Sequence, residues 1–419
     1  MHEQSCECTK SELDLFSVPP TQTSMESGNW IEYHPLTAVA DGSPIEFEIG
    51  GSGEDYIDFG NSMLYVQAKI TQPDGNDLGA GVNTGPVNLF LHSLFSQVDI
   101  QLNGTLITSS TNTYPYRAML ETLLSYGEDA KKTQLSSALY YKDAAGQMDT
   151  LALAAGDGVV PNEGLVKRSR HTHRSRVVDM MGRLHADIFF QDRYMLNEVN
   201  VKIKLVRSKD IFCVMSQADC KVMITKAAMF VRKVKLSPSV FLAHAKALEN
   251  GTAKYPIRRV VPQGFRGISH EKLFSGQRTS GTKSVQLSAF RCYRNIAVSR
   301  WTATGGYKTD GAELSRVHPD GQYIRAYNTL FSGTGKICRD EGTAIDRNDY
   351  ANGYTLYAFD LTADLGDEES FNLMRQGSVR LILKFGEAVA VTISVVVYTE
   401  FENVIDIDRN RNIIYDFAA

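Results

Sequence analysis

Two histidines at 171 and 173 have the spacing of a metal-binding pair. In cupin enzymes a His-x-His pair is followed, after three or four residues, by a Glu, and a Gly lies six residues before it. The Glu positions here are Val177 and Val178, and the Gly position is Leu165. Arginines flank both histidines and would repel a bound cation. We therefore expect a solvated segment and no metal site.

The same segment, 167–176, is the densest basic run of the chain, with five Lys or Arg and two His in ten residues. Such a run is typical of a nuclear-import signal or of a patch that faces DNA. The alternative is an exposed loop between strands that pairs with acidic groups on a neighbouring subunit. Both interpretations stay open. The basic residues concerned are Lys167, Arg168, Arg170, Arg174 and Arg176.

Other candidate motifs lack the residues that their chemistry requires. The glycine-rich segment 332–336 resembles a phosphate-binding loop, but Leu330 stands where such a loop needs Gly, and Ile337 where it needs Ser or Thr. The segment 346–353 has an arginine and a misplaced glycine for a calcium loop. Cys6 and Cys8 have no second pair nearby. We expect no enzyme activity, no cofactor and no metal.

The bulk composition describes an ordinary globular chain. Its 419 residues exceed the size of one hydrophobic core, so two domains are expected. The net charge of −4 argues against nucleic-acid binding by the chain as a whole. Six cysteines without regular spacing fit a reducing compartment. The polar, acidic start of the chain is not a signal peptide.

Alternation of apolar and polar residues dominates the chain and predicts strands. The segment 98–102 alternates and is followed by Asn103-Gly104, which is the strongest short signal for a hairpin. Only two segments have helical character, 116–126 and 239–250. Many strands and few helices indicate an all-β class. The other alternating segments are 45–49, 201–205, 379–385 and 391–398.

The two halves of the chain share an order of elements. The segment Leu184–Asp187 precedes the strand at Val201, and Leu361–Asp364 precedes the strand at Val379 at nearly the same interval. A long apolar strand follows in each half, so a duplicated β domain is indicated. Two eight-stranded sandwiches in tandem make a double jelly roll. We expect an arm at 1–36, a first jelly roll at 37–236, a helical linker at 237–252, a second jelly roll at 253–403 and a C-terminal tail at 404–419.

Short segments spread over most of the chain carry a family likeness. They are DLFSVPPTQTS at 14–24, YHPLT at 33–37, PIEF at 44–47, GEDYID at 53–58, LHSLFSQV at 91–98, YRAMLETLLSYG at 116–127, NGYTLYAFDLT at 352–362 and ENVIDIDRNR at 402–411. In this order they resemble the major capsid proteins of Polinton/Maverick elements and adintoviruses.

The resemblance implies a hexon-like structural protein of the virion. Three chains with two rolls each would form a pseudo-hexameric capsomer, and capsomers would tile an icosahedral shell around double-stranded DNA. The implied partners are further copies of the chain and the penton and minor capsid proteins. The enclosed genome would not be bound specifically. Assembly would take place in the host cell, and in the nucleus if the basic run is an import signal.

The first 36 residues are polar with isolated apolar anchors, too few to fold alone. We expect this arm to become ordered on a neighbouring subunit or on the capsid floor. The insertions at 71–86 and 141–176 are candidates for outward towers. The alternative function is a cellular, lectin-like binding module with a jelly-roll fold. The arm's anchors are Phe16, Pro19, Pro20, Trp30 and Tyr33.

Overall fold

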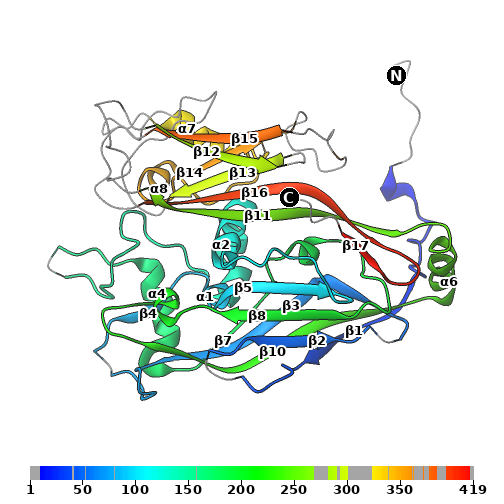
Figure 1. Ribbon diagram of the computed structural model, residues 1–419, viewed down its shortest axis with the longest axis horizontal. Helices are drawn as coiled ribbons and strands as arrows, with labels where there is room; N and C mark the ends of the chain where they lie inside the picture. The colour runs from blue at the N-terminus through cyan, green and yellow to red at the C-terminus, as the bar shows by residue number, and fades with distance from the viewer. Residues whose placement is uncertain are drawn as a thin grey trace.

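In the computed structural model, two β-sandwiches lie side by side across the long axis of an elongated molecule (Figure 1). One sandwich is built mainly from the N-terminal half of the chain and the other from the C-terminal half. The α2 helix, Tyr114–Ser125, lies between them. The structure describes residues 10–39, 42–51, 53–79, 81–156, 158–268, 282–289, 293–300, 323–337, 339–360, 362, 371, 377–384 and 393–415.

The first sandwich is formed by eight described strands in two antiparallel sheets. One sheet has the order β1-β10-β3-β7 and the other β2-β8-β5-β6. Counted along the chain, these orders are 1-8-3-6 and 2-7-4-5, which is the strand order of a jelly roll. The strands are β1 (Met25–Tyr33), β2 (Ile45–Ile49), β3 (Asp55–Thr71), β5 (Phe95–Leu102), β6 (Thr105–Leu106), β7 (Val178–Gly182), β8 (Val201–Arg207) and β10 (Lys221–Leu236).

The second sandwich repeats this order in the strands that are described. Its sheets are β11-β16-β13-β14 and β12-β15, which occupy positions 1-8-3-6 and 2-7 of the same scheme. The predicted double jelly roll is therefore confirmed. The strands are β11 (Ala253–Ile268), β12 (Thr282–Ala289), β13 (Tyr293–Arg300), β14 (Leu356–Asp360), β15 (Gly377–Lys384) and β16 (Ile393–Ile407), and β17 (Ile413–Tyr415) pairs with β16.

The internal repeat seen in the sequence corresponds to equivalent strands. β8 and β15 both take the seventh position, and β10 and β16 both take the eighth. The first of the two matching segments leads into a short 3-10 helix, Asp187–Phe190. The second, Leu361–Asp364, lies almost wholly outside the described residues. The equivalence thus rests on strand order, which is more specific than the short sequence match.

Two strands contribute side chains to both hydrophobic cores. In β11, Tyr255 and Ile257 are buried in the core of the first roll, whereas Val260 belongs to the second core. In β16, Ile405 is fully buried in the first core and Val397 in the second. Since β11 and β16 pair along almost their whole length, the rolls share a continuous two-stranded ribbon. The α2 helix likewise contributes to both cores.

The predicted hairpin at Asn103-Gly104 is confirmed. β5 and β6 pair across it, and both residues have positive φ, +46° for Asn103 and +82° for Gly104. Both predicted helices are also present, as α2 and as α6, Pro238–Ala247, between β10 and β11. Among the described residues, no helix has the length and apolar character needed to cross a membrane.

Short helices and one small sheet decorate the two rolls. β4 (Thr84–Pro86) and β9 (Val214–Ser216) form a separate two-stranded sheet. The remaining α-helices are α1 (Phe90–Ser93), α3 (Glu128–Lys132), α4 (Glu163–Thr172), α5 (Asp210–Cys213), α7 (Ile324–Ser332) and α8 (Arg347–Ala351).

The ends of the two rolls differ from the expected boundaries. β1 begins at Met25, inside the segment expected to be an arm, because its pairing with β10 adds it to the first roll as an edge strand. Most side chains of β1 are exposed on both faces, so the sequence has no alternating apolar pattern that would predict this strand. At the other terminus β16 runs to Ile407 and turns into β17, where a tail from residue 404 was expected.

The shared ribbon predicts that the two rolls unfold together. Replacing Ile405 with Ala in β16 should lower the free energy of unfolding by about 2–5 kcal/mol, because it leaves a cavity in the first core. The control is Ile414→Ala, since Ile414 is 55% exposed. Chemical denaturation followed by fluorescence and circular dichroism should give one transition for both variants. Two separate transitions in the Ile405→Ala variant would contradict the coupling.

Candidate functional site

The N-terminal segment 10–24 is the most exposed part of the described chain. Phe16 is 97% exposed, and three aliphatic residues near it are between 66% and 86% exposed. Pro19 and Pro20 are exposed as well. The segment meets the body where Ser24 accepts a hydrogen bond of 2.9 Å from the amide of Ser237, just before α6. We name residues 10–24 the arm. Its exposed aliphatic residues are Leu13, Leu15 and Val18.

Trp30 and Tyr33, which were expected to anchor the arm, belong to β1 instead. The indole N–H of Trp30 donates to the carbonyl of Asn61, and the Arg232 guanidinium lies 5.5 Å from the Trp30 ring. Lys233 lies 5.9 Å from the ring of Tyr33. Trp30 nevertheless stays 61% exposed. Trp30 therefore lies on the exposed surface of the first roll, whereas Tyr33 is half-buried and packs against its core.

The basic run is a helix, so the expectation of an exposed loop was wrong. Residues 163–172 form α4, and a 3-10 turn, His173–Ser175, follows it. Asn162 caps the helix by accepting a hydrogen bond from the amide of Gly164. Lys167, Arg170, Arg174 and Arg176 are exposed. We name these four residues the basic cluster.

Arg168 does not belong to the basic cluster, because its side chain is completely buried. Its guanidinium pairs with Asp143 at 2.8 Å and donates to the carbonyls of Pro86 and Tyr141. Arg168 therefore ties α4 to the β4 segment. A Cβ at Gly85 would lie 2.7 Å from Cδ1 of Leu165, so the absence of a side chain at Gly85 allows α4 to pack closely there without a shift of Leu165.

The arm and the basic cluster lie at opposite ends of the molecule. α4 and β4, which come from the insertions at 141–176 and 71–86, pack together at one end of the long axis (Figure 1). The arm leaves the body beside α6 at the other end. Any surface that one of them contacts is therefore far from the surface that the other contacts.

The two histidines of the basic run have separate environments. His171 stacks on Tyr141, and its Nε2 lies 3.1 Å from the Tyr141 hydroxyl, while His173 starts the 3-10 turn. Within the described part of the chain, no three His, Cys, Asp or Glu side chains gather where they could hold a metal ion. In the glycine-rich motif, Lys336 donates to the carbonyl of Ser125 at the end of α2.

A buried network of charged residues joins the two rolls around α2. Arg117 pairs with Glu121 on the same helix at 2.7 Å and with Asp187 at 2.6 Å. Asp187 accepts from the amide of Val260 in β11, and Glu121 accepts from the hydroxyl of Tyr398 in β16. The network was missed from the sequence, although Arg117 and Glu121 stand one helical turn apart within a predicted helix.

The charge of Arg117 lowers the pKa values of both carboxylates beside it, Glu121 and Asp187, against the effect of burial. Burial would raise the pKa of Glu121, but the charge of Arg117 and a hydrogen bond from His185 hold that pKa at about 2. Burial raises the pKa of Asp187 despite the same arginine. The pKa of Arg117 itself is raised, because Asp187 and Glu121 outweigh its burial. Glu121 therefore contributes stability above about pH 4.5, and this contribution is lost as the pH falls toward 2.

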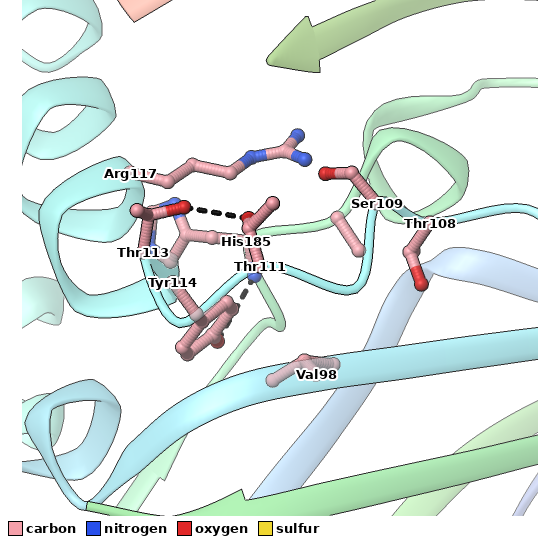
Figure 2. A pocket seen from close by; sticks show the side chains of 9 residues that line it. Val98, Thr108, Ser109, Thr111, Thr113, Tyr114, Arg117 and His185 are labelled. Carbon is pink, nitrogen blue, oxygen red and sulfur yellow. Dashed lines mark hydrogen bonds between the residues drawn. The ribbon is translucent and has the colours of Figure 1, made fainter. Parts of the chain in front are cut away.

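A small hollow beside this network has no room for a substrate. Its volume is about 20 Å³, which suits a single water molecule. Figure 2 shows the hydroxyls of Thr111, Thr113 and Ser109 around it, together with Arg117. Nearby, burial lowers the pKa of His92 well below its ordinary value, and His92 Nδ1 lies 2.8 Å from the Tyr114 hydroxyl. The contact between His92 and Tyr114 links α1 to α2.

Three lysines gather where α2 ends against the second roll. Lys131 is buried and donates to the carbonyl of Leu123 at 2.8 Å and to that of Thr343 at 2.6 Å. Lys142 donates to the carbonyl of Ala344. Burial, with smaller effects from Lys336 and Lys142, lowers the pKa of Lys131 to about 7.

The C-terminal hairpin fastens the second roll to the first. Arg411 lies in the turn between β16 and β17 with φ of +63° and donates to the carbonyl and side-chain oxygens of Asn197. Asn103, from the β5–β6 hairpin, donates to the carbonyl of Arg411. A surface ion pair also lies at the end of β16, where Lys254 is 3.1 Å from Asp406.

Comparison with known proteins identifies the fold. No protein-family model matches the chain. It is 22% identical over 433 residues to F54H12.2, an uncharacterized protein of Caenorhabditis elegans, a match covering 95% of this chain and 99% of that protein.

Solved structures match over nearly the whole chain. The Sputnik virophage structure matches with a TM-score of 0.61 at 10% identity, covering 99% of this chain and 94% of that one. VP54 of PBCV-1 gives 0.60 at 10% identity, covering 96% and 99%. The Faustovirus major capsid protein gives 0.55 at 9% identity, covering 94% and 92%. The fold of this chain is the double jelly roll of these proteins.

The buried network predicts a large effect for one substitution. Arg117→Met should lower the free energy of unfolding by about 3–5 kcal/mol, because it leaves Glu121 and Asp187 as buried carboxylates without their cation. Arg170→Met, on the exposed face of α4, is the control and should change it by less than about 0.5 kcal/mol. Equal effects of the two substitutions in urea denaturation would refute the assigned role of Arg117.

Lys131 predicts a pH dependence of stability. Its pKa is about 7 when folded against 10.5 ordinarily, so the unfolded chain binds more protons between these values and stability rises with pH across this window. The stability gained by Lys131→Met should therefore be about 2 kcal/mol larger at pH 7 than at pH 9.

The neighbouring Lys132 supplies the control for this measurement. Lys132 is exposed and pairs with Glu128, so Lys132→Met should show no such difference between the two pH values. Urea denaturation of the three proteins at pH 7 and pH 9 measures it. A pH-independent effect of Lys131→Met would show that Lys131 stays charged in the folded protein.

Proposed function

We propose that this chain is the major capsid protein of a double-stranded DNA virus or virus-like element of the Polinton/Maverick and adintovirus kind. Three copies form a hexon-like, pseudo-hexameric capsomer, and capsomers tile an icosahedral shell. The observation that carries the proposal is the same strand order twice in one chain, in two rolls that share a ribbon and two cores.

Rigid coupling of two similar rolls suits this role. Three such chains in a ring present six similar outer walls, and a closed ring prevents open-ended filaments. The likeness to the Faustovirus major capsid protein extends over both rolls. A relative of similar length in a nematode supports an element that resides in animal genomes.

The two ends of the molecule suit two faces of a shell. We place the arm on the inner side and the two packed insertions at the α4 end on the outer side. The basic cluster would then face away from the packaged DNA. An import signal read before assembly is consistent with this placement, whereas a DNA-facing patch is not. We keep residues 237–252 as the linker between the rolls, and penton and minor capsid proteins as further partners.

A lectin-like binding module is the less favoured alternative. A binding module needs one sandwich with a site at its rim, whereas the likeness to viral proteins extends over both rolls of this chain. The hollow beside Arg117 suits only a water molecule.

Self-association is the direct test of the capsid proposal. The purified chain should form a species near three times 46.5 kDa by light scattering after size exclusion, stable to dilution and high salt. Removing residues 1–24 should leave the folded rolls intact, because β1 begins at Met25. The truncated chain should fail to form complete shells by electron microscopy. A monomer at all concentrations would contradict the proposal and favour the binding module.

A further inference from the structure

We infer that the arm of one copy of this chain binds along the exposed face of α6 of a neighbouring copy. The inference rests on the proposed self-assembly and names the two surfaces that meet. The arm carries apolar side chains without a partner, and α6 is an apolar helix without a cover. Both lie at the same end of the molecule (Figure 1).

The arm has the composition of a segment that is ordered by a partner. Phe16 is 97% exposed, and Leu15 is 75% exposed. Burying one such side chain contributes roughly 1.5–3 kcal/mol to binding in water. Asp14 accepts hydrogen bonds from the amide and hydroxyl of Ser17, so a local turn already limits the arm's freedom.

The α6 helix offers a matching surface. Six of its ten residues are Ala, Val, Leu or Phe, and none of the ten is buried. Phe241 packs against the first core, and His244 Nδ1 lies 3.1 Å from the Tyr56 hydroxyl, so these residues mark the inner face. Leu242 is 66% exposed and points outward. Helical spacing places the exposed Ala245 and Lys246 beside it.

Charge favours the same pairing. The arm carries Glu12 and Asp14, both exposed, near its apolar residues. On α6, the exposed Lys246 stands one turn after Leu242. In the inferred contact, the exposed face of α6, with one leucine, small alanines and a flanking lysine, meets an exposed segment of bulky apolar residues with flanking carboxylates. Such a contact combines apolar burial with a favourable charge order at its rim.

The geometry of the arm favours a neighbour over its own α6. The arm leaves the body beside the first turn of α6 but makes no contact that buries its side chains. Pro19 and Pro20 hold fixed φ angles and keep Val18 extended, which opposes a sharp reversal. Fully extended, the arm can carry Phe16 up to about 26 Å from Ser24, which is beyond the roughly 15 Å length of a ten-residue helix.

Isotope-coded cross-linking tests this contact. Unlabelled chains carry the photoreactive residue benzoylphenylalanine in place of Phe16, and they are assembled with heavy-isotope chains that lack it. After irradiation and digestion, mass spectrometry should find the light peptide around residue 16 joined to the heavy peptide of residues 238–247. Leu242→Glu in the heavy chain should reduce this product roughly tenfold.

A matched control variant and two contradicting results complete the cross-linking experiment. Val160→Glu is the matched control, because Val160 is 59% exposed but precedes α4 at the other end, and it should leave the yield unchanged. Assembled complexes with cross-links only within light chains, or only outside α6, would overturn the inference and leave the capsid proposal standing. If light scattering of the same mixture shows only monomers, both the inference and the capsid proposal fail.

Discussion

The structure depends on the β11–β16 ribbon, which is packed into two hydrophobic cores at once. Ile405 and Ile407 fill the first core from a strand whose other end forms the second. The rolls are thus joined by continuous main-chain pairing as well as by surface contact. A loose tandem of sandwiches would let each roll tilt, whereas the ribbon holds the two rolls at a constant angle. The proposed capsomer depends on such a constant angle.

Polar contacts complete the junction where apolar packing is least specific. Apolar surfaces of the two rolls could pack in several positions. The two ion pairs of Arg117 form only when Glu121 and Asp187 are both beside it. The Asp187 contact with Val260 and the Tyr398 contact with Glu121 then set the position of the ribbon against α2. A buried network of this kind adds little net stability compared with well-packed apolar residues, although breaking it is costly. We propose that its value here lies in excluding alternative dockings of the two rolls.

The sequence predicted the parts of the fold that have a local signal. Alternation predicted β2, β5 and β8, and Asn103-Gly104 predicted the turn of the β5–β6 hairpin. β1 has no such signal, because it is held by main-chain bonds to β10 and buries neither face. α4 was missed because its sequence is mostly polar and lacks an apolar face, since one of its buried side chains is the cation of Arg168. Partners distant in sequence, such as Arg117 with Asp187, cannot be inferred from spacing within one segment.

The way β1 is attached has a mechanical consequence. The arm continues directly into β1, and β1 lies antiparallel to β10 from Met25 to Tyr33. A pull on the arm along the strand axis would load the hydrogen bonds of this pairing in shear, all at once, instead of opening them one after another. In the proposed shell, tension on the arm would pass through β1, at the edge of its sheet, into the neighbouring strand β10. The exposed edge strand would act as the anchor of a tether.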